Sequence, residues 1–449
     1  MKKVTRLWFF LLLVKIVLAT FIPLFADEAY YWVWSKNLQL SYYDHPGMIA
    51  WLFSLGSFLD NIFQACRIPG VILGHFTILI WFLILKDEIR EKNYPLYMIG
   101  LSLIPLSGMG SLIMTPDLPL LFFWSLSLFA FLSTVKEENK KRLIGYYLLL
   151  GGALGLGFCA KYHIVLFPMA AFGYLILEKK LRSVHWKYLG FCLLSFIIFS
   201  TPTWLWNFQH DFISFRYQLN HGLGKTTPSL LWPTRYVTDQ LLLIFPPILL
   251  LAFTKIRGLK SELSWLNYFA WTPIVFFFFT SFKGQVEANW TATAYPAIFS
   301  LAFIAAQAKE RLRWIKITAI IWLALFSLTL SQLAFHWIPS SSITKKMDEI
   351  HQYKPLVAAA TKQIPLFTSN YQMASLLSFY VKKPFFKLNS VGRKDFFDYL
   401  PGSKPTTKEF YWSANDTTPL PAWAMDAGYE IVDEKTVKES LILYTVRVP

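Results

Sequence analysis

The chain has 449 residues, of which 55% are hydrophobic, 18% aromatic and only 16% charged. Its mean hydropathy is +0.41. This composition excludes an ordinary soluble domain and is typical of a polytopic membrane protein. The formal net charge of +16 would suit a nucleic-acid partner, but the basic residues lie in short loops between apolar runs, where they act as topology signals and contact lipids. We therefore predict membrane lipids, and no nucleic acid, as partners.

Hydropathy predicts about eleven transmembrane helices. They lie near residues 7–25, 67–85, 94–113, 118–134, 143–159, 163–177, 187–205, 239–254, 265–281, 290–307 and 315–335. The apolar segment 47–60 is shorter and ends at Asp60, so we expect a re-entrant or interfacial helix there. The first run could be a signal peptide, but bulky Leu24 stands where a cleavage site needs a small residue, so we expect the run to be retained.

Basic residues separate the loops into two sets. One set is rich in Lys and Arg, with Lys140, Lys141 and Arg142 as an example. The same basic-rich set includes Lys255 and Arg257. The opposite short loops hold few basic residues, which are Lys36, Lys161, Arg216, Lys225, Arg235 and Lys283. By the positive-inside rule, the amino terminus is cytoplasmic and the basic-poor loops face outward. The chain is thus predicted to be a multi-pass protein of the cell inner (plasma) membrane.

The composition changes after Phe335. Residues 336–449 lose the long apolar runs and alternate short strand and helix patterns, with strands near 364–369 and 441–446 and an amphipathic helix over 371–381. A segment of about 110 residues is long enough for a small domain with its own core. The predicted fold is mainly α: a transmembrane helical bundle over 1–335 and a small extracytoplasmic α/β domain over 336–449.

An acidic pair opens the first outward loop. Asp27 and Glu28 follow the first apolar run directly, and the same loop carries Tyr43, Asp44 and His45. A carboxylate costs about 2.5–3.5 kcal/mol at the bilayer centre, so paired acids belong at the membrane surface or in a polar cavity. A solvated helix end would explain the acidic pair alone. The additional acid and histidine favour a functional site.

The other outward loops add further polar residues. They are Asp117, Lys161, His163, His210, Arg216, Lys283 and Glu287. Each one alone has a structural explanation, such as a helix cap or a contact with lipid phosphate. Together, on one side of the membrane, acids for proton transfer and cations for a phosphate suit the transfer of a group from a phosphate leaving group. The glycine-rich stretch 151–157 lies within a predicted span and is expected to serve helix packing, not nucleotide binding.

Short motifs then connect the chain with a known group of enzymes. They are DEAYYW at 27–32, SYYDHPGM at 41–48, TPDLPLL at 115–121, GFCAKYH at 157–163, WNFQH at 206–210, EANW at 287–290 and, in the tail, YQMASLLSFY at 371–380 with Gly392-Arg393. Across nearly the whole chain, this set resembles the GT-C membrane glycosyltransferases, the group of the protein O-mannosyltransferases, aminoarabinose transferases and lipid A galacturonosyltransferases. One departure is His45-Pro46-Gly47, where many relatives have Lys-Pro-Pro. Histidine is a weaker and pH-dependent ligand for phosphate.

The resemblance implies an inverting transfer of a sugar from a polyprenyl-phosphate donor to a lipid or glycan acceptor, at an active site on the periplasmic side. It implies Asp27 as the general base and Glu28 as the orienting acid, although the two roles could be exchanged. Lys161, Arg216, Lys283 and His45 would bind the donor phosphate. Supporting or acceptor-binding residues would be Tyr43, Asp44, Asp117, His163, His210 and Glu287.

Two questions stay open at the level of sequence. No cofactor or metal is predicted, because cations suffice to neutralise the phosphate, but a metal near Glu28, His45 and His210 is an alternative. The three cysteines, Cys66, Cys159 and Cys192, provide neither a disulfide framework nor metal-ligand spacing. Two alternative functions remain: a transporter or flippase for lipid-linked sugars, and a non-catalytic assembly subunit. A transporter is disfavoured because the ionisable residues concentrate at one face and no internal repeat is evident.

Overall fold

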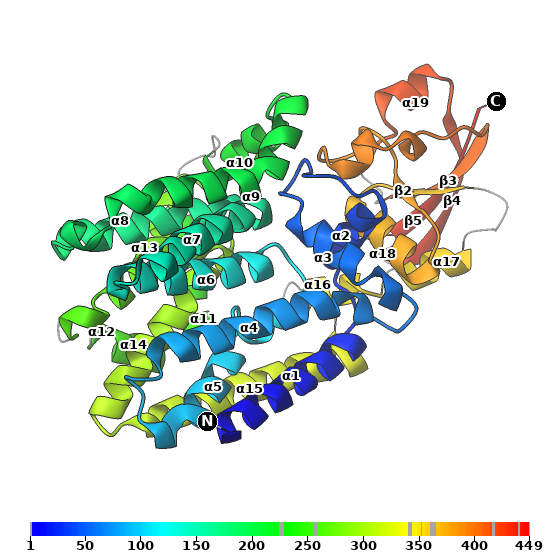
Figure 1. Cartoon of the computed structure of the whole chain (residues 1–449). Coiled ribbons are helices and arrows are strands. Elements are labelled where there is room, and N and C mark those ends of the chain that lie inside the picture. Colours follow the sequence, from blue (N-terminus) through cyan, green and yellow to red (C-terminus); the bar gives the residue numbers. More distant parts are fainter. Residues whose placement is uncertain are drawn as a thin grey trace. The chain divides into compact units, whose positions relative to one another are not determined.

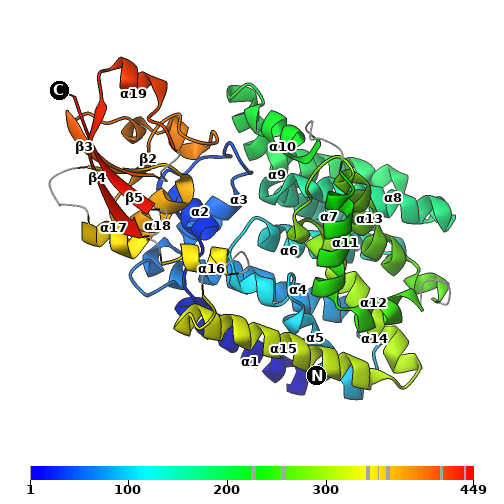
Figure 2. The same cartoon turned by 180° about the vertical axis from the view of Figure 1, so that it is seen from behind.

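The computed structural model describes residues 2–223, 229–254, 259–339, 344–351, 353–359, 365–414, 418–438 and 441–448. The chain divides into two compact units, shown in two views in Figure 1 and Figure 2. Unit 1 consists of Met1–Phe21 and Leu40–Thr329, and unit 2 of Ile22–Gln39 and Leu330–Pro449. The segment that carries the acidic pair therefore groups with the tail. The division at 335/336 stays a prediction, and Lys225, Lys255, Arg257 and Ile364 lie outside the described residues.

Unit 1 is helical. Its helices are α1 (Lys2–Phe21), α3 (Met48–Leu55), α4 (Ile68–Leu85), α5 (Tyr94–Leu103), α6 (Asp117–Lys136), α7 (Lys140–Ala160), α8 (Leu166–Leu177), α9 (Leu189–Gln209), α10 (Ile213–Leu223), α11 (Leu231–Ile244), α12 (Pro246–Phe253), α13 (Trp265–Ser281), α14 (Tyr295–Ala308) and α15 (Leu312–Phe335), the last of which continues into unit 2.

Within the described residues, eight helices are long and apolar enough to cross a membrane, or nine if the bent pair α11–α12 counts as one span. The chain is thus a multi-pass membrane protein, as predicted. The predicted number of about eleven is higher because it includes two shorter segments, Tyr162–Leu177 and α5.

Prolines explain where the predicted spans differ from the observed helices. The predicted span 94–113 is wrong as a continuous helix: α5 ends at Leu103, because Ile104 precedes Pro105 and a residue before proline disfavours the helical conformation. The predicted span 239–254 is broken, with α11 and α12 at 92° to each other. The break lies at Phe245, which has φ 72° and precedes two prolines. In the segment 47–60, α3 has eight residues, too few to span a bilayer.

Helix α14 is the central helix of unit 1, since all residues from Tyr295 to Gln307 are buried. Helices α7 and α9 pack closely because α7 has glycines at the contact. A Cβ atom at Gly151 would lie 2.0 Å from the carbonyl oxygen of Cys192, and one at Gly155 would lie 2.8 Å from that of Phe196. The expected packing role of the glycine-rich stretch is confirmed. The three cysteines are buried and free of disulfides.

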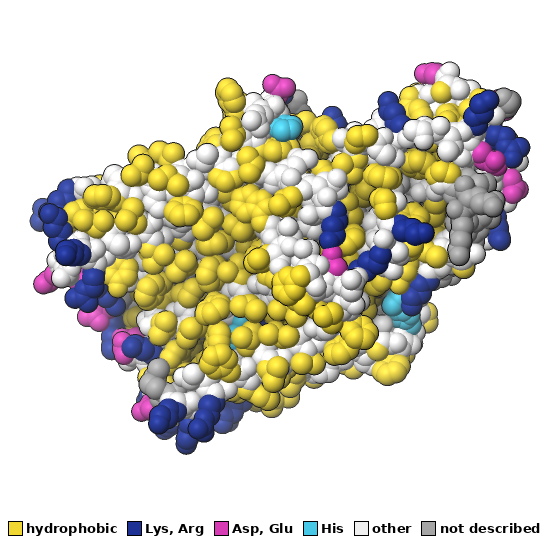
Figure 3. All heavy atoms as spheres, turned by 45° about the vertical axis from the view of Figure 1, so that its right-hand side comes forward, with side chains coloured by type: hydrophobic (Ala, Val, Ile, Leu, Met, Phe, Trp, Pro, Cys, Tyr) yellow, Lys and Arg dark blue, Asp and Glu magenta, His cyan; other side chains and the backbone are white. Residues whose placement is uncertain are grey.

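A broad hydrophobic surface covers the helices in Figure 3, and Lys and Arg side chains gather at its lower left end. The exposed apolar side chains include Phe9, Leu193, Leu250 and Phe279. Such a continuous apolar face is what lipid requires of a spanning bundle.

Basic-rich loops meet at one end of unit 1. Lys260 and Glu88 form an ion pair of 3.4 Å, and Arg90 pairs with Glu310. The side chain of Lys180 donates a hydrogen bond of 3.0 Å to the carbonyl oxygen of Ser261. These contacts place the loops that the positive-inside rule assigns to the cytoplasm beside one another.

Unit 2 contains a five-stranded sheet and several short helices. Its elements are α2 (Ala26–Lys36), α16 (Lys345–Glu349), α17 (Tyr353–Ala359), β1 (Leu366–Thr368), α18 (Tyr371–Val381), β2 (Phe386–Lys387), β3 (Glu409–Ala414), α19 (Ala422–Asp426), β4 (Glu430–Lys438) and β5 (Leu441–Arg447). The strand order is β2-β1-β3-β5-β4, with β1 parallel to β2 and β3, and β5 antiparallel to β3 and β4.

The sheet of unit 2 carries a hydrophobic core. Residues of alternating strand positions form it, among them Phe367, Phe410, Trp412 and Val446. A second cluster joins Leu366 and Leu443 to Met373 and Leu377 of α18. The predicted amphipathic helix 371–381 coincides with α18, and a small C-terminal sheet accompanies the mainly helical fold, so the predicted fold class is confirmed.

Candidate functional site

The acidic pair lies in the first turn of α2 in unit 2. Glu28 is fully buried, and its Oε2 accepts a hydrogen bond of 3.1 Å from the backbone nitrogen of Phe25, the residue before the helix. Asp27 is half-buried. Both carboxylates occupy the helix end whose partial positive charge favours anions. The two acids thus differ: Glu28 holds the start of the helix, and Asp27 is the more accessible.

Asp27 accepts a hydrogen bond from a tyrosine in the C-terminal part of the chain. Its Oδ1 accepts a hydrogen bond of 3.0 Å from Oη of Tyr371, 344 residues away in sequence and in the same unit. Tyr371 is the first residue of α18, which begins there because the side chain of Asn370 caps it and accepts a bond of 2.9 Å from Met373 N. Tyr371 was part of a sequence motif but was not a predicted site residue.

In unit 1, Asp117 and Lys161 form a buried ion pair. Lys161 Nζ lies 2.6 Å from Asp117 Oδ1, and their side chains are 6% and 13% exposed. Asn289 donates a bond of 2.6 Å to the second oxygen of Asp117. Asp117 begins α6 and Lys161 follows the end of α7, so the helix ends bring the two charges together. Asn289, which the sequence motif contained, was missed as a member of this cluster.

The remaining first-loop residues lie against α10 of unit 1. Gln218 donates a hydrogen bond to the carbonyl oxygen of Asp44, and its Nε2 lies 3.4 Å from Nδ1 of His45. The rings of Tyr43 and Tyr217 are 4.7 Å apart. Asp44 is buried, whereas Tyr43 and His45 are half-buried.

A tyrosine links the third and fourth of the basic-poor loops. Tyr162 Oη lies 3.0 Å from Ser214 Oγ and accepts a bond of 3.3 Å from Asn207. Together with the Asp117 cluster and the Gln218 contacts, these bonds connect the basic-poor loops of unit 1 with one another. The shared side that the charge pattern predicted for these loops is therefore present in their contacts.

Four other predicted site residues lie outside these clusters. His163 packs on Trp290, with ring centroids 5.4 Å apart. His210 is exposed, stacks on Trp206 at 4.0 Å, and its Nδ1 lies 2.8 Å from that residue's carbonyl oxygen. Arg216 is exposed and donates to the carbonyl oxygen of Asp211, while Lys283 is exposed in the loop after α13.

Glu287 lines a polar pocket. The pocket holds about 280 Å³, and its charged or amide side chains are Arg235, Asp239, Gln285 and Glu287. Glu287 accepts a hydrogen bond of 3.0 Å from Gln285, and Arg235 lies 3.9 Å from Asp239. Mixed charges and an amide offer both donors and acceptors, the groups that bind hydroxyl-rich molecules.

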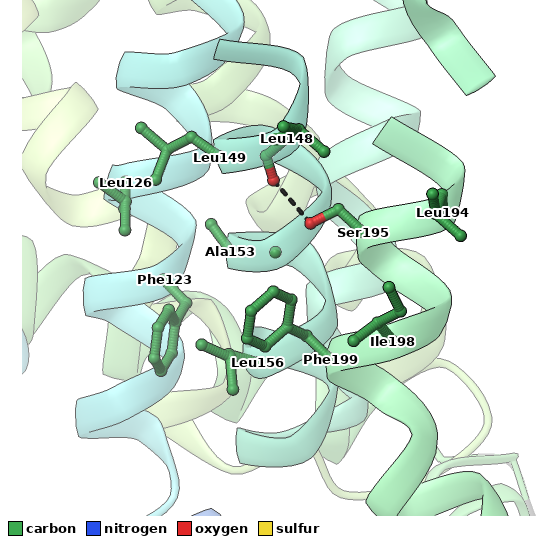
Figure 4. Close-up of a pocket in the computed structure, with 11 residues that line it drawn as sticks. Phe123, Leu126, Leu148, Leu149, Ala153, Leu156, Leu194, Ser195, Ile198 and Phe199 are labelled. Atoms are coloured by element: carbon green, nitrogen blue, oxygen red, sulfur yellow. Dashed lines mark hydrogen bonds between the residues drawn. The ribbon is translucent and has the colours of Figure 1, made fainter. Parts of the chain in front are cut away.

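A second pocket is almost entirely apolar. It holds about 410 Å³ between α6, α7 and α9, and Figure 4 shows Phe123, Leu156 and Phe199 facing it. Its one hydroxyl, that of Ser195, donates a bond of 2.8 Å to the carbonyl oxygen of Leu148. This lining suits hydrocarbon and provides no group for acid–base chemistry.

No group of three His, Cys, Asp or Glu side chains that could hold a metal ion occurs in the part of the chain that the structure describes.

The resemblance inferred from the sequence motifs is confirmed: the chain is similar, in sequence or in fold, to several GT-C membrane glycosyltransferases. Residues 44–206 match the model of the dolichyl-phosphate-mannose-protein mannosyltransferase family. The lipid A galacturonosyltransferase RgtD of Rhizobium johnstonii is 27% identical over 289 residues, an alignment that covers 61% of this chain and 58% of RgtD. The lipopolysaccharide core galacturonosyltransferase RgtA of the same organism is 29% identical over 41% of this chain and 38% of its own length.

The solved structures extend the similarity of fold to nearly the whole chain. ArnT from Cupriavidus metallidurans in the apo state matches with a TM-score of 0.69 at 12% identity, covering 98% of this chain and 97% of ArnT. The same protein bound to undecaprenyl phosphate matches with a TM-score of 0.66 at 14% identity over the same shares. The oligosaccharyltransferase of Archaeoglobus fulgidus matches at 0.50 with 12% identity, covering 91% of this chain and 69% of its own.

Proposed function

We propose that this protein is a membrane glycosyltransferase that moves a sugar from a polyprenyl-phosphate donor to a cell-envelope acceptor, with inversion at the anomeric carbon. The acceptor class is lipid A, another glycolipid, a glycan or a protein. The reaction takes place on the outer face of the inner membrane, where the basic-poor loops are predicted to lie.

The observation that carries the proposal is the accessible carboxylate of Asp27 at the start of α2, in a chain with the ArnT fold throughout. The hydroxyl of Tyr371 donates a hydrogen bond to Oδ1 of Asp27, whereas Oδ2 has no hydrogen-bond partner among the described residues. An oriented carboxylate with one oxygen available is what a general base requires. Glu28 is fully buried and bonded to the backbone, so we assign it to positioning.

In the proposed step, the acceptor oxygen attacks the anomeric carbon of the donor sugar. Its proton passes to Asp27, the bond between the anomeric carbon and the phosphate oxygen breaks, and the polyprenyl phosphate leaves with the electron pair. The negative charge that develops on the leaving phosphate needs cations nearby. Arg216 and Lys283 are exposed cations of the outward loops and are proposed to provide them, with His45 assisting.

Lys161, unlike the exposed Arg216 and Lys283, is nearly buried. Its ammonium already pairs with Asp117 in a nearly buried position. We propose that this pair, with Asn289, fixes the outward ends of α6 and α7, and that any contact of Lys161 with phosphate is shared with Asp117. The polar pocket around Glu287 is proposed to bind hydroxyl groups of a sugar, and the apolar groove of Figure 4 is proposed to accommodate a lipid chain.

The proposal is tested with Asp27→Asn, an almost isosteric change that removes the basic oxygen. Loss of a general base typically lowers the rate by about 10²–10⁴-fold, so the variant should bind donor but form almost no product. Purified protein would be assayed with a labelled polyprenyl-phosphate sugar, following donor binding and product separately. Asp60→Asn is the matched control, because it makes the same change in the segment 47–60 outside the proposed site.

Two outcomes would contradict the proposal. Turnover of Asp27→Asn at the wild-type rate would mean that the acidic pair is structural. Movement of labelled donor across vesicle membranes by the wild-type protein, with no sugar transferred, would identify a flippase instead.

A further inference from the structure

The C-terminal part of the chain contacts the acidic motif directly. Within unit 2, α2 packs on α18, and both views show the two helices side by side (Figures 1 and 2). Trp32 of α2 meets Phe379 of α18 with ring centroids 5.2 Å apart, and Lys382 lies over both rings. At the other end of this contact, the hydroxyl of Tyr371 bonds to Asp27.

The ring of Tyr371 is held by neighbours from two segments. The guanidinium carbon of Arg393 lies 4.5 Å from its centroid, in the range of a cation–π contact. The ring of Tyr30 from α2 also lies 4.5 Å away. Tyr30 is fixed in turn, because its hydroxyl accepts a bond of 2.8 Å from the backbone nitrogen of Phe396. These contacts restrict where the Tyr371 hydroxyl can point.

A buried ion cluster anchors the segment that carries Arg393. Lys387 is almost fully buried, and its Nζ lies 2.9 Å from Asp395 and 2.7 Å from Asp398. The same ammonium donates a bond of 2.9 Å to the carbonyl oxygen of Arg393. Burial raises the pKa of the Asp395 carboxyl, and the neighbouring Lys387 ammonium acts in the opposite direction. A buried cluster with these bonds allows the segment little freedom.

We propose that Tyr371 is a positioning residue for Asp27, held in place by Arg393, and that the C-terminal domain thereby completes the catalytic base. This inference rests on the proposed function. The hydrogen bond fixes Oδ1, which directs Oδ2 to the acceptor hydroxyl. Without it, the Asp27 side chain could rotate away from the geometry that proton transfer requires, and misplacement by about 1 Å can cost roughly 10²-fold in rate.

The central test is Tyr371→Phe, which removes the hydroxyl and keeps the ring with its Arg393 and Tyr30 contacts. Hydrogen bonds to charged groups contribute enough for a loss of roughly tenfold or more in kcat. If the hydroxyl acts through Asp27 alone, donor binding and KM should stay within about twofold of wild type. The variant should still fold, because the ring and its packing are retained, and its unfolding temperature should fall only by the contribution of the lost hydrogen bond.

Tyr380→Phe is the matched control on the same helix. Its hydroxyl also bonds to the segment before α2, accepting a bond of 2.9 Å from Leu24 N, but it does not contact Asp27. Its ring stacks on Tyr353 at 4.4 Å, so the ring is retained in the variant as well. The control should keep wild-type kcat, which separates orientation of Asp27 from general attachment of the two segments.

Arg393 gives a second, independent measurement should Tyr371→Phe fail to fold. Arg393→Met removes the cation above the ring and should lower kcat at unchanged donor binding, and Arg393→Lys should restore part of it. Equal kcat in Tyr371→Phe, Tyr380→Phe and wild type would overturn the inference. If at the same time Asp27→Asn is inactive, the proposed transferase function stands, whereas full activity of Asp27→Asn would remove both.

Discussion

At the scale of single residues, the pair Asp117–Lys161 shows what sequence patterns leave out. Both residues were predicted to belong to the site, one as support and one as a phosphate ligand. Their ion pair spans 44 positions and depends on how α6 and α7 end beside each other. The sequence marks the charges, but only the fold decides which charges neutralise one another. The same holds for Tyr371 and Asp27, whose contact spans 344 positions.

A buried cation and an exposed cation should respond differently to removal. Lys161→Met leaves Asp117 buried without its partner, and breaking such a pair typically costs about 3–5 kcal/mol. We expect a clear loss of stability in thermal unfolding of the purified protein. Arg216→Ala removes an exposed guanidinium, so stability should stay near wild type while donor binding weakens several-fold.

Two variants complete this comparison. Asp117→Asn combined with Lys161→Met removes both charges and should recover part of the lost stability. Arg216→Lys should restore donor binding only in part, if the guanidinium binds the phosphate through two nitrogens. Normal stability of Lys161→Met together with poor donor binding would show that Lys161 is foremost a phosphate ligand.

At the scale of elements, helices were predictable where one apolar run had no interruption. The predicted span 118–134 became α6 at Asp117–Lys136, and 143–159 became α7 at Lys140–Ala160. Prolines limited the prediction elsewhere. A hydropathy window averages over Pro105 and Pro246, although each changes the backbone path locally. The break between α11 and α12 was therefore signalled by Phe245-Pro246-Pro247, which the window did not weigh.

The contact of α7 with α9 makes a prediction that depends on one methyl group. Gly151→Ala would place a Cβ 2.0 Å from the carbonyl oxygen of Cys192, so the helices would have to separate. We expect a loss of stability of about 1–3 kcal/mol, the usual cost of overpacking. Thermal unfolding and the yield of folded protein measure it.

Gly145→Ala is the control on the same helix. An added Cβ at Gly145 meets nothing within 4 Å, and alanine favours a helix over glycine by about 1 kcal/mol. This variant should be as stable as wild type or slightly more so. Similar behaviour of the two variants would mean that α7 and α9 are not in close contact.

At the scale of the whole molecule, the loops of unit 1 sort into two sets that the charge pattern had separated. The basic-rich loops are joined by the contacts of Glu88, Arg90 and Lys180, and the basic-poor loops by those of Asp117, Tyr162 and Gln218. Charge bias reports this separation well, because it reflects the membrane and not particular contacts. It did not indicate that residues 22–39 group with the tail, since a contact between distant segments leaves no periodic signal.

The last prediction concerns which set of loops faces the cytoplasm. Val4, near the start of α1, lines one pocket with Leu83 of α4, and Thr20, near the end of α1, accepts a hydrogen bond from Gln64 before α4. Helix α1 therefore starts near the end of α4, and α15 begins after Glu310, which pairs with Arg90. Both helices therefore start at the basic-rich end of unit 1 and run away from it, so the chain leaves both at the opposite end. If the basic-rich end is cytoplasmic, the tail must be extracytoplasmic.

A reporter fused after residue 345 should then be active only as an exported protein, and one inserted within 136–142 only as a cytoplasmic one. A control insertion in the loop that holds Lys260 should behave like that in 136–142, because Lys260 pairs with Glu88 in the same set of loops. Both principal reporters on one side would contradict the helix directions, and an exchange of the two sides would place Asp27 in the cytoplasm and remove the basis for a periplasmic reaction.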